Sequence, residues 1–259
     1  MINLMVVKKK LIARSRKKLY LFSFLIVIGV ICIIFVGTLA AHRAKQFTVL
    51  PQAVQDEPAI LAVDSANTIT DPAWFKQAHQ EGIDLYIIHS TIWGTCTPWN
   101  RTQPQLKMAL DAGMKIAAYT RDPSCWQGGI AATGPYQKDL TFFALDIETD
   151  PGIPVTSQMV NGLEAAGVQP VIYTGADMWP TIEGSNANNF KTIPLWDTDA
   201  TYQEPQALVA DLSVPKAQVY GGWNAPETMR IGIQQYFEYS LNGVDVDISS
   251  FDESFVNSR

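Results

Sequence analysis

The sequence contains few residues of the types that build metal and phosphate sites. Its three histidines, His42, His79 and His89, have no paired spacing, so a zinc site of the H-x-x-x-H kind is not expected. It also lacks a G-x-S-x-G nucleophile elbow and a glycine-rich loop for phosphate. We therefore expect neither a metal ion nor another cofactor.

Cysteine is equally scarce. Cys32 lies within a long apolar stretch, which leaves Cys96 and Cys125 for the remainder of the chain. Two thiols in an oxidising compartment can pair, and the disulfide would close a loop of about thirty residues, worth roughly 3 kcal/mol. Because a sequence does not show whether two Cα atoms approach each other, two unpaired cysteines remain the alternative.

Acidic residues are absent from the first fifty positions, which contain nine lysines and arginines. The rest of the chain carries the other ten basic residues and all 25 acidic ones, a net charge of about −15. A nucleic-acid partner needs a basic face, so we expect none here. The two parts of the chain are suited to different surroundings.

The uncharged stretch from Tyr20 to Ala40 predicts a transmembrane helix, because roughly twenty apolar residues span the ~30 Å hydrocarbon core of a bilayer. The basic segment 1–19 before it indicates a cytoplasmic N-terminus. We expect a single-pass protein of the cell membrane with an extracellular C-terminal domain. A cleaved signal peptide is the alternative, because small residues follow the stretch, and the protein would then be secreted. Signal peptides usually have apolar regions of only ~7–15 residues, which favours the anchor.

Residues 41–57 show no sustained periodicity and are interpreted as a stalk, and an alternation of strands and helices fills residues 58–259. The strand-like segments are 59–67, 84–90, 115–121, 141–150, 169–175, 192–200, 217–223 and 231–239, and the helical ones are 71–82, 103–113 and 156–167. About eight strands over roughly 200 residues predict an α/β fold, an irregular (β/α) TIM-like barrel. A doubly wound open sheet is the alternative.

Polar residues gather at the ends of the predicted strands, where the loops of such a barrel form its mouth. These residues are Asp64, His89, Tyr119, Arg121, Asp146, Glu148, Tyr173, Trp196 and Asp197, with Asp245 and Asp247 near the C-terminus. Asp146 and Glu148 are two residues apart on one strand, so their side chains should share a face.

Two carboxyl groups at an aromatic-rich mouth suit glycoside hydrolysis. One protonates the leaving oxygen, and the other attacks or stabilises the developing cation. Six tryptophans at or just after strand ends could contact sugar rings, namely Trp93, Trp99, Trp126, Trp179, Trp196 and Trp223. A D-x-E sequence at a strand end can also be a simple cap, and an aromatic residue there can serve only packing.

The order of several segments resembles glycoside hydrolase family 25, the muramidases or lysozymes. The segments are "AVDSAN", "ALDIETD", "VIYTGADMW", "PLWDTDA", "IQQYFEY" and "VDVDISSF", and together they cover residues 59 to 255. The resemblance implies an irregular β/α barrel that hydrolyses the β-1,4 bond between N-acetylmuramic acid and N-acetylglucosamine in peptidoglycan. Peptidoglycan, or a related polysaccharide, would be the partner of a protein that we expect to be a monomer.

The same resemblance implies roles for individual residues. Glu148 would be the general acid, and Asp146 would act as nucleophile or assist attack by the acetamido group of the substrate. Asp64 and Asp247 would complete the acidic floor, and Asp245 fits the spacing of the family less well. The expected sugar-binding residues are Tyr119, Tyr173, Trp196, Gln235, Tyr236 and His89, the last as a hydrogen-bonded pocket residue.

Two departures from the family concern the walls of the groove. "IHSTIWG" replaces a "KATEG"-like segment, and "YTR" with Arg121 replaces a "YHF"-like one. A glycosidase acting on another polysaccharide is therefore an alternative, as is a non-catalytic wall-binding or carbohydrate-binding barrel. The complete acid set favours the enzyme.

Overall fold

The computed structural model describes residues 58–198, 208–212, 223 and 230–258. The predicted basic segment 1–19, transmembrane helix 20–40 and stalk 41–57 lie outside these residues. So does most of the predicted strand 217–223. No helix within the described ranges is long and apolar enough to cross a membrane.

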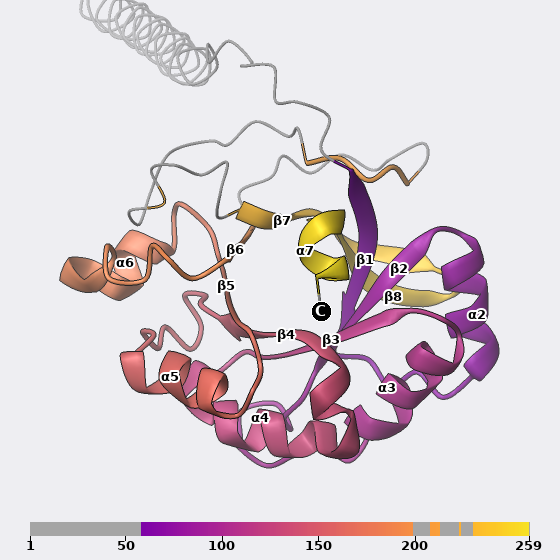
Figure 1. The fold of residues 1–259 in the computed structure, drawn as a ribbon, viewed down its shortest axis with the longest axis horizontal. Helices are drawn as coiled ribbons and strands as arrows, with labels where there is room; N and C mark the ends of the chain where they lie inside the picture. Colours follow the sequence, from indigo (N-terminus) through magenta and orange to yellow (C-terminus); the bar gives the residue numbers. More distant parts are fainter. Residues whose placement is uncertain (1–57, 199–207, 213–222, 224–229, 259) are drawn as a thin grey trace, which may run out of the picture. The chain divides into compact units, whose positions relative to one another are not determined.

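Eight strands form a closed barrel (Figure 1). They are β1 (Ala59–Ser65), β2 (Ile83–His89), β3 (Lys115–Thr120), β4 (Leu140–Asp146), β5 (Pro170–Thr174), β6 (Leu195–Asp197), β7 (Arg230–Leu241) and β8 (Val244–Asp252). Neighbours from β1 to β7 are parallel, whereas β8 is antiparallel to both β7 and β1. The predicted barrel is confirmed, and the open doubly wound sheet is wrong.

Helices connect the parallel strands in the first part of the barrel. They are α2 (Pro72–Gln80), α3 (Thr102–Asp111), α4 (Trp126–Thr133) and α5 (Ser157–Ala165), followed by the shorter α6 (Trp179–Glu183) and α7 (Glu253–Asn257). Short 3-10 turns occur at Pro123–Cys125, Gly134–Asp139 and Gly184–Asn186. Among the described residues, the helices after β5 are shorter than those before it, in agreement with the expected irregular barrel.

Alternating side chains of the strands divide between two apolar clusters. In β4, Phe143 and Leu145 pack outward against the helices, whereas Phe142 and Ala144 belong to the cluster inside the barrel. All seven residues of β4 are buried, which explains its nearly continuous apolar sequence. The strands are therefore packed on both faces, against the helices on the outside and against one another's side chains on the inside.

Helix α7 closes the end of the barrel opposite the mouth. Its Phe255 and Val256 pack against the interior cluster, and the ring centroid of Phe255 lies 6.2 Å from that of Phe142. The backbone N–H of Glu253 donates to the carbonyl of Pro58, just before β1, at 2.9 Å. Figure 1 shows α7 in front of the opening that the strands enclose. The interior is therefore packed at this end.

Helix α4 was not expected from the sequence, because its paired glycines Gly128 and Gly129 are poor helix formers. The structure explains why a glycine is needed there. A Cβ atom at Gly128 would overlap the backbone carbonyl of Cys96, so the loop after β2 can approach the helix only if position 128 has no side chain.

The loop that approaches Gly128 is also joined to α4 by a disulfide between Cys96 and Cys125, whose Cα atoms are 4.6 Å apart. The predicted pairing is confirmed. The bond ties the loop between β2 and α3 to the start of α4. Within that loop the Ile92 N–H donates to the Thr97 carbonyl at 2.8 Å, and Thr91 and Pro98 form an isolated β-bridge. The loop is thus closed by backbone and covalent contacts together.

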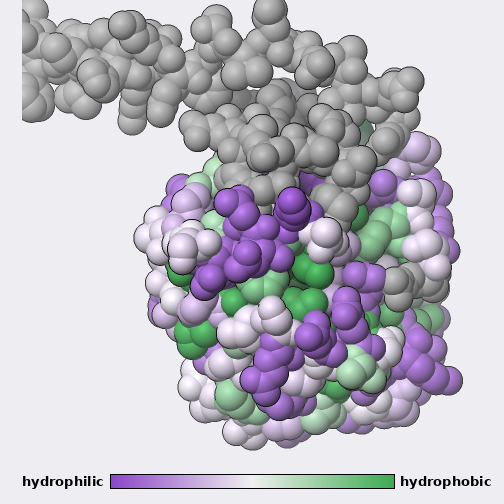
Figure 2. Space-filling model, turned by 60° about the vertical axis from the view of Figure 1, so that its left-hand side comes forward, coloured by the Kyte–Doolittle hydropathy of each residue, from purple (hydrophilic) through white to green (hydrophobic). Residues whose placement is uncertain are grey.

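The face drawn in Figure 2 mixes hydrophilic residues with small groups of hydrophobic ones. Large hydrophobic side chains that the structure shows as exposed are Ile92, Trp93, Val209 and Phe237. Two of them, Trp93 and Phe237, lie at the cavity described below.

Removing both cysteines of the disulfide should destabilise the barrel by about 3 kcal/mol. Without the bond, which joins residues 29 positions apart, the unfolded chain has a higher conformational entropy. For a domain of this size the melting temperature should fall by roughly 5–10 °C. The comparison is thermal unfolding of the full-length protein with Cys96→Ala and Cys125→Ala against the parent. Cys32→Ala is the control, and equal melting temperatures for all three proteins would contradict the prediction.

Candidate active site

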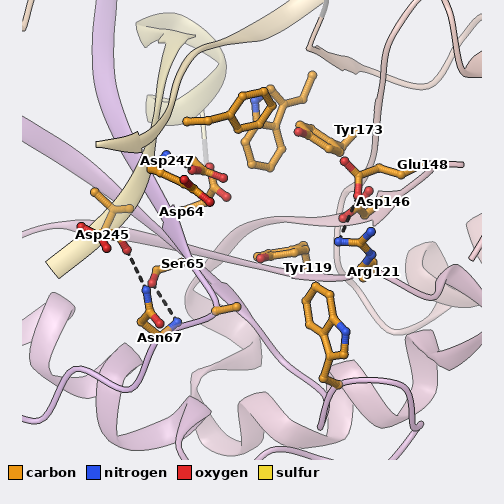
Figure 3. Close-up of a pocket in the computed structure, with 16 residues that line it drawn as sticks. Asp64, Ser65, Asn67, Tyr119, Arg121, Asp146, Glu148, Tyr173, Asp245 and Asp247 are labelled. Atoms are coloured by element: carbon orange, nitrogen blue, oxygen red, sulfur yellow. Dashed lines mark hydrogen bonds and ion pairs between the residues drawn. The ribbon is translucent and has the colours of Figure 1, made fainter. Parts of the chain in front are cut away.

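A cavity of about 690 Å³ opens at the mouth of the barrel, where the parallel strands end (Figure 3). Its carboxylates come from four strands or their ends, namely Asp64, Asp146, Glu148, Glu238, Asp245 and Asp247. Its aromatic lining consists of Trp93, Tyr119, Tyr173, Trp196 and Phe237. The four predicted catalytic acids therefore share one cavity.

Asp64 and Asp247 stand next to each other because β1 and β8 pair at this position. Asp64 is 7% exposed, and its Oδ2 atom has no hydrogen-bond partner among the described residues. Asp247 accepts a hydrogen bond from the backbone N–H of Glu238 at 2.8 Å. The antiparallel course of β8 is what brings the second acid to the mouth.

Asp146 and Glu148 keep the alternation of a strand beyond the end of β4. Ile147 between them is buried in the outer core, and its N–H donates to the Tyr173 carbonyl at 2.8 Å. The hydroxyl of Thr174 donates to the Ile147 carbonyl at 2.9 Å. These contacts with β5 hold the peptide extended, so both carboxylates face the cavity. The expectation that they share a face is confirmed.

Arg121 contacts the acid that follows β4. Its Nη1 lies 3.3 Å from Glu148 Oε2, and its Nε donates to the Asp150 carbonyl at 2.8 Å. Its guanidinium carbon lies 4.7 Å from the ring centroid of Trp93. Arg121 is the one basic side chain among the described residues that line the cavity.

Burial and mutual repulsion change the acidity of these carboxyl groups. Burial raises the pKa of Asp64 well above its usual value, and the charges of Asp247, Asp146 and Glu148 raise it further. Burial likewise raises the pKa of Asp146 well above the ordinary range, which the charge of Glu148 reinforces and Arg121 opposes. The floor of the cavity therefore favours protonated carboxyl groups.

The other two acids are affected less strongly. Burial raises the pKa of Glu148, whereas the neighbouring Arg121 lowers it and Asp150 raises it. For Asp247 burial again raises the pKa, and the hydrogen bond from the Glu238 N–H opposes the change. Carboxyl groups with different affinities for protons are thus placed around one space, as acid–base chemistry requires.

His89 does not line the cavity and is 4% exposed. Its ring centroid lies 5.2 Å from that of Trp93 and 5.1 Å from that of Tyr119. Burial, assisted by the charge of Arg121, lowers the pKa of His89 to about 4, so the ring is neutral at physiological pH. Its position beneath two aromatic residues of the cavity indicates support for the wall.

The remaining predicted sugar-binding residues divide into two groups. Tyr119, Tyr173 and Trp196 line the cavity, and the indole N–H of Trp196 donates to the Ser249 hydroxyl at 3.1 Å. Gln235 and Tyr236 are not among the lining residues. Gln235 instead accepts a hydrogen bond from the Ser250 hydroxyl at 2.8 Å, and Tyr236 packs against the outer core.

An irregularity in β7 accounts for this division. The pairing of β7 with β8 shifts between Gln234 and Tyr236 and again before Tyr239. Gln234, which lies just before the first shift, accepts a hydrogen bond from the Tyr173 hydroxyl. The shift brings Phe237 and Glu238 to the cavity, Glu238 with a φ of 49°. No pattern in the sequence marks these two residues, whereas Trp93 and Asp245 lie in segments whose polar and aromatic residues are predicted to reach the mouth.

No group of three or more histidine, cysteine, aspartate or glutamate side chains within the described ranges could hold a metal ion.

No known protein-family profile matches this chain, and no curated protein sequence matches it. Among solved structures, an uncharacterized B. stearothermophilus protein is similar with a TM-score of 0.51 and 15% identity, over 76% of this chain and 97% of that one. The likeness shows a shared fold.

Two further structures score lower. A glycoside hydrolase family 5 enzyme from Prevotella bryantii B14 has a TM-score of 0.35 and 12% identity, over 52% of this chain and 55% of that one. A dihydropteroate synthase from Xanthomonas albilineans has a TM-score of 0.32 and 15% identity, over 55% and 72%. At these scores neither likeness carries an argument about function.

Asp64→Asn should stabilise the protein at pH 8 by roughly 1–3 kcal/mol, because it removes a buried charge that has an unpartnered oxygen. A carboxyl group whose pKa is raised in the folded state releases its proton later than in the unfolded chain. Its ionisation therefore lowers stability as the pH rises from about 4 towards the folded-state pKa. Below that window the advantage of the asparagine should disappear.

The measurement is the melting temperature of parent and Asp64→Asn at pH 4 and pH 8. Asp139→Asn, at an exposed position outside the cavity, is the matched control. A gain at pH 8 that persists unchanged at pH 4, or no gain at either pH, would refute the electrostatic explanation.

Proposed function

We propose that this protein is an extracellular glycosidase of lysozyme type, which hydrolyses the β-1,4 bond between N-acetylmuramic acid and N-acetylglucosamine in peptidoglycan. The observation that carries the proposal is the meeting of Asp146 and Glu148 with Asp64 and Asp247 in one cavity at the mouth of a closed barrel. The resemblance of the ordered sequence segments to glycoside hydrolase family 25 adds the substrate and the linkage.

In this proposal Glu148 protonates the oxygen of the leaving sugar. It is the less buried member of the pair after β4, with a side chain 23% exposed, so a glycosidic oxygen in the cavity can reach it. Burial raises its pKa and thereby lets it keep a proton closer to neutral pH. These properties suit a general acid.

Asp146 lies deeper, at the end of β4, and is 5% exposed. Its Oδ1 is buried and has no hydrogen-bond partner among the described residues. In its ionised form it would attack the sugar or assist attack by the acetamido group, and both roles need the same position. Asp64 and Asp247 would hold the substrate across the cavity through hydrogen bonds and, when ionised, would stabilise positive charge developing on the sugar ring.

Aromatic side chains supply flat apolar surfaces for the sugars. Tyr173 and Trp196 pack against each other with ring centroids 4.6 Å apart and form one wall. Trp93 and Phe237 are 57% and 45% exposed. Such exposure is unfavourable for a large apolar side chain in water, and stacking against a sugar ring would relieve it.

The proposed location follows from the sequence. The predicted helix at 20–40 would anchor the protein in the cell membrane with residues 58–259 outside, next to the wall polymer. Cleavage after this stretch would release the same domain as a secreted monomer. Peptidoglycan, and the membrane through the anchor, are the proposed partners.

A second candidate function is a barrel that binds wall polysaccharide without cleaving it. The ion pair between Arg121 and Glu148 favours this alternative, because the guanidinium stabilises the carboxylate and opposes its use as an acid. A glycosidase for another polysaccharide is supported by Arg121 and Trp93, which stand where the resembling family has other residues.

Glu148→Gln should abolish most of the release of reducing ends from purified peptidoglycan by the full-length protein in detergent. Loss of a general acid typically lowers the rate by about 10²- to 10⁴-fold. Glu164→Gln, on the exposed side of α5, is the matched control and should retain the parental rate. Equal circular dichroism and melting temperatures would show that the folds are intact.

Other outcomes would point elsewhere. A parent that binds peptidoglycan but releases no sugar would favour the binding barrel. A parent that cleaves a different polysaccharide, with the same dependence on Glu148, would keep the mechanism and replace the substrate. Full activity in Glu148→Gln would refute the proposed acid.

A further inference from the structure

The charged groups of the cavity are arranged asymmetrically. Figure 3 shows Asp64, Asp245 and Asp247 on one side, and Arg121 with Asp146 and Glu148 on the other. Arg121 is the only basic side chain of the lining within the part of the chain that the structure describes. A ligand with one negative group would therefore be repelled from the first side, and on the second side Arg121 offers it the one opposite charge.

Two contacts fix the position of the Arg121 guanidinium group. The Nε atom donates to the Asp150 carbonyl at 2.8 Å, and the guanidinium stacks on Trp93. Trp93 in turn lies on the loop that the Cys96–Cys125 disulfide closes. The arginine is thus held in place by contacts that do not require its two terminal nitrogens.

Those terminal nitrogens are held more loosely. Nη1 lies 3.3 Å from Glu148 and Nη2 lies 3.7 Å from Asp150, whereas strong charge-assisted hydrogen bonds are about 2.7–2.9 Å long. The Arg121 side chain is 29% exposed at the cavity. A carboxylate entering from the cavity could take a bidentate position here that neither protein carboxylate now occupies.

We propose that Arg121 binds a free carboxylate of the glycan and so makes the site selective for carboxylate-bearing sugars. This inference rests on the proposed function and extends it to the choice of strand. The incoming carboxylate replaces Glu148 at Nη1, and Glu148 is then released to act on the glycosidic oxygen. The ion pair that opposes acid catalysis in the free protein becomes the binding site for the substrate.

The chemistry of peptidoglycan determines which strands such a site would select. N-acetylmuramic acid carries a lactyl carboxylate, which is free only where no peptide is attached, because the peptide converts it to an amide. The preferred substrate is therefore a peptide-free glycan strand. An amide-cleaving reaction that removes the peptides must supply it.

The test compares peptide-free strands with the same strands after their carboxylates have been converted to primary amides. The full-length parent should show a kcat/KM about 10- to 100-fold higher on the carboxylate form, the effect expected of a bidentate charged contact. In Arg121→Gln this ratio should fall towards 1, mainly through KM for the carboxylate form. Arg121→Lys should restore part of the ratio, because it keeps the charge and loses the fork.

Arg101→Gln is the matched control, since it removes the same charge at an exposed position before α3, outside the cavity. It should keep the parental ratio. Melting temperatures of all variants would identify any that fail to fold. A parental ratio near 1, or an unchanged ratio in Arg121→Gln, would overturn the inference.

A measurement of binding distinguishes a failure of this inference from a failure of the proposed function. Calorimetric titration of peptide-free and amidated strands measures the preference without requiring cleavage. If the parent cleaves neither form but binds the carboxylate form more tightly, in a manner lost in Arg121→Gln, the inference holds and the glycosidase fails. If cleavage occurs with equal binding and equal rates for both forms, the glycosidase holds and the inference fails.

Discussion

The hydrogen bonds of β8 to both β1 and β7 close the sheet, and the positions of the carboxyl groups in the candidate site depend on that closure. Without β8 two strand edges would be left unpaired, and the interior cluster would lack Phe251, which packs 5.3 Å from Trp196 between ring centroids. Because β8 runs against its neighbours, its beginning lies at the mouth. Asp245 and Asp247 therefore meet the ends of the parallel strands.

The carboxyl groups gathered at the mouth of the barrel lower the stability of the folded state. Asp64 and Asp146 each have an unpartnered buried oxygen, and each lies in the field of other acids. A packed domain normally avoids this arrangement, since a buried charge without a partner is unfavourable. The compensation comes from the two apolar clusters, which hold the strand ends rigidly enough to keep the carboxyl groups together. Buried carboxyl groups that repel one another and have raised pKa values are characteristic of functional sites.

Much of this architecture could be predicted from the sequence. Apolar runs and helix-ending glycines were sufficient for the first five strands, and strand ends located Asp64, Asp146 and Glu148. Asp247 was different, because the rule that polar residues at the ends of strands form the mouth applies to parallel strands. Only its spacing to the final phenylalanine, taken from the family resemblance, singled it out.

The errors have local physical causes. Helix α4 contains two glycines that a sequence pattern reads as a turn, yet one of them permits the close approach of the Cys96 carbonyl. In β7 it is Gln234 rather than Gln235 that contacts Tyr173, and the pairing with β8 shifts immediately after Gln234. Register shifts of this kind depend on the partner strand, so alternation along one strand cannot reveal them. Arg121 was expected at a strand end and as a departure from the resembling family, but its contact with Glu148 depends on how the ends of β3 and β4 are placed side by side.

Helix α7 has a consequence for how a polymer can use this barrel. Phe255 and Val256 fill the end opposite the mouth, so a glycan cannot be threaded through the strands. A polysaccharide bound as proposed would have to associate with the mouth and dissociate from it on the same side. Such docking does not require a free chain end, so the proposed glycan substrate could be bound at any point along a strand.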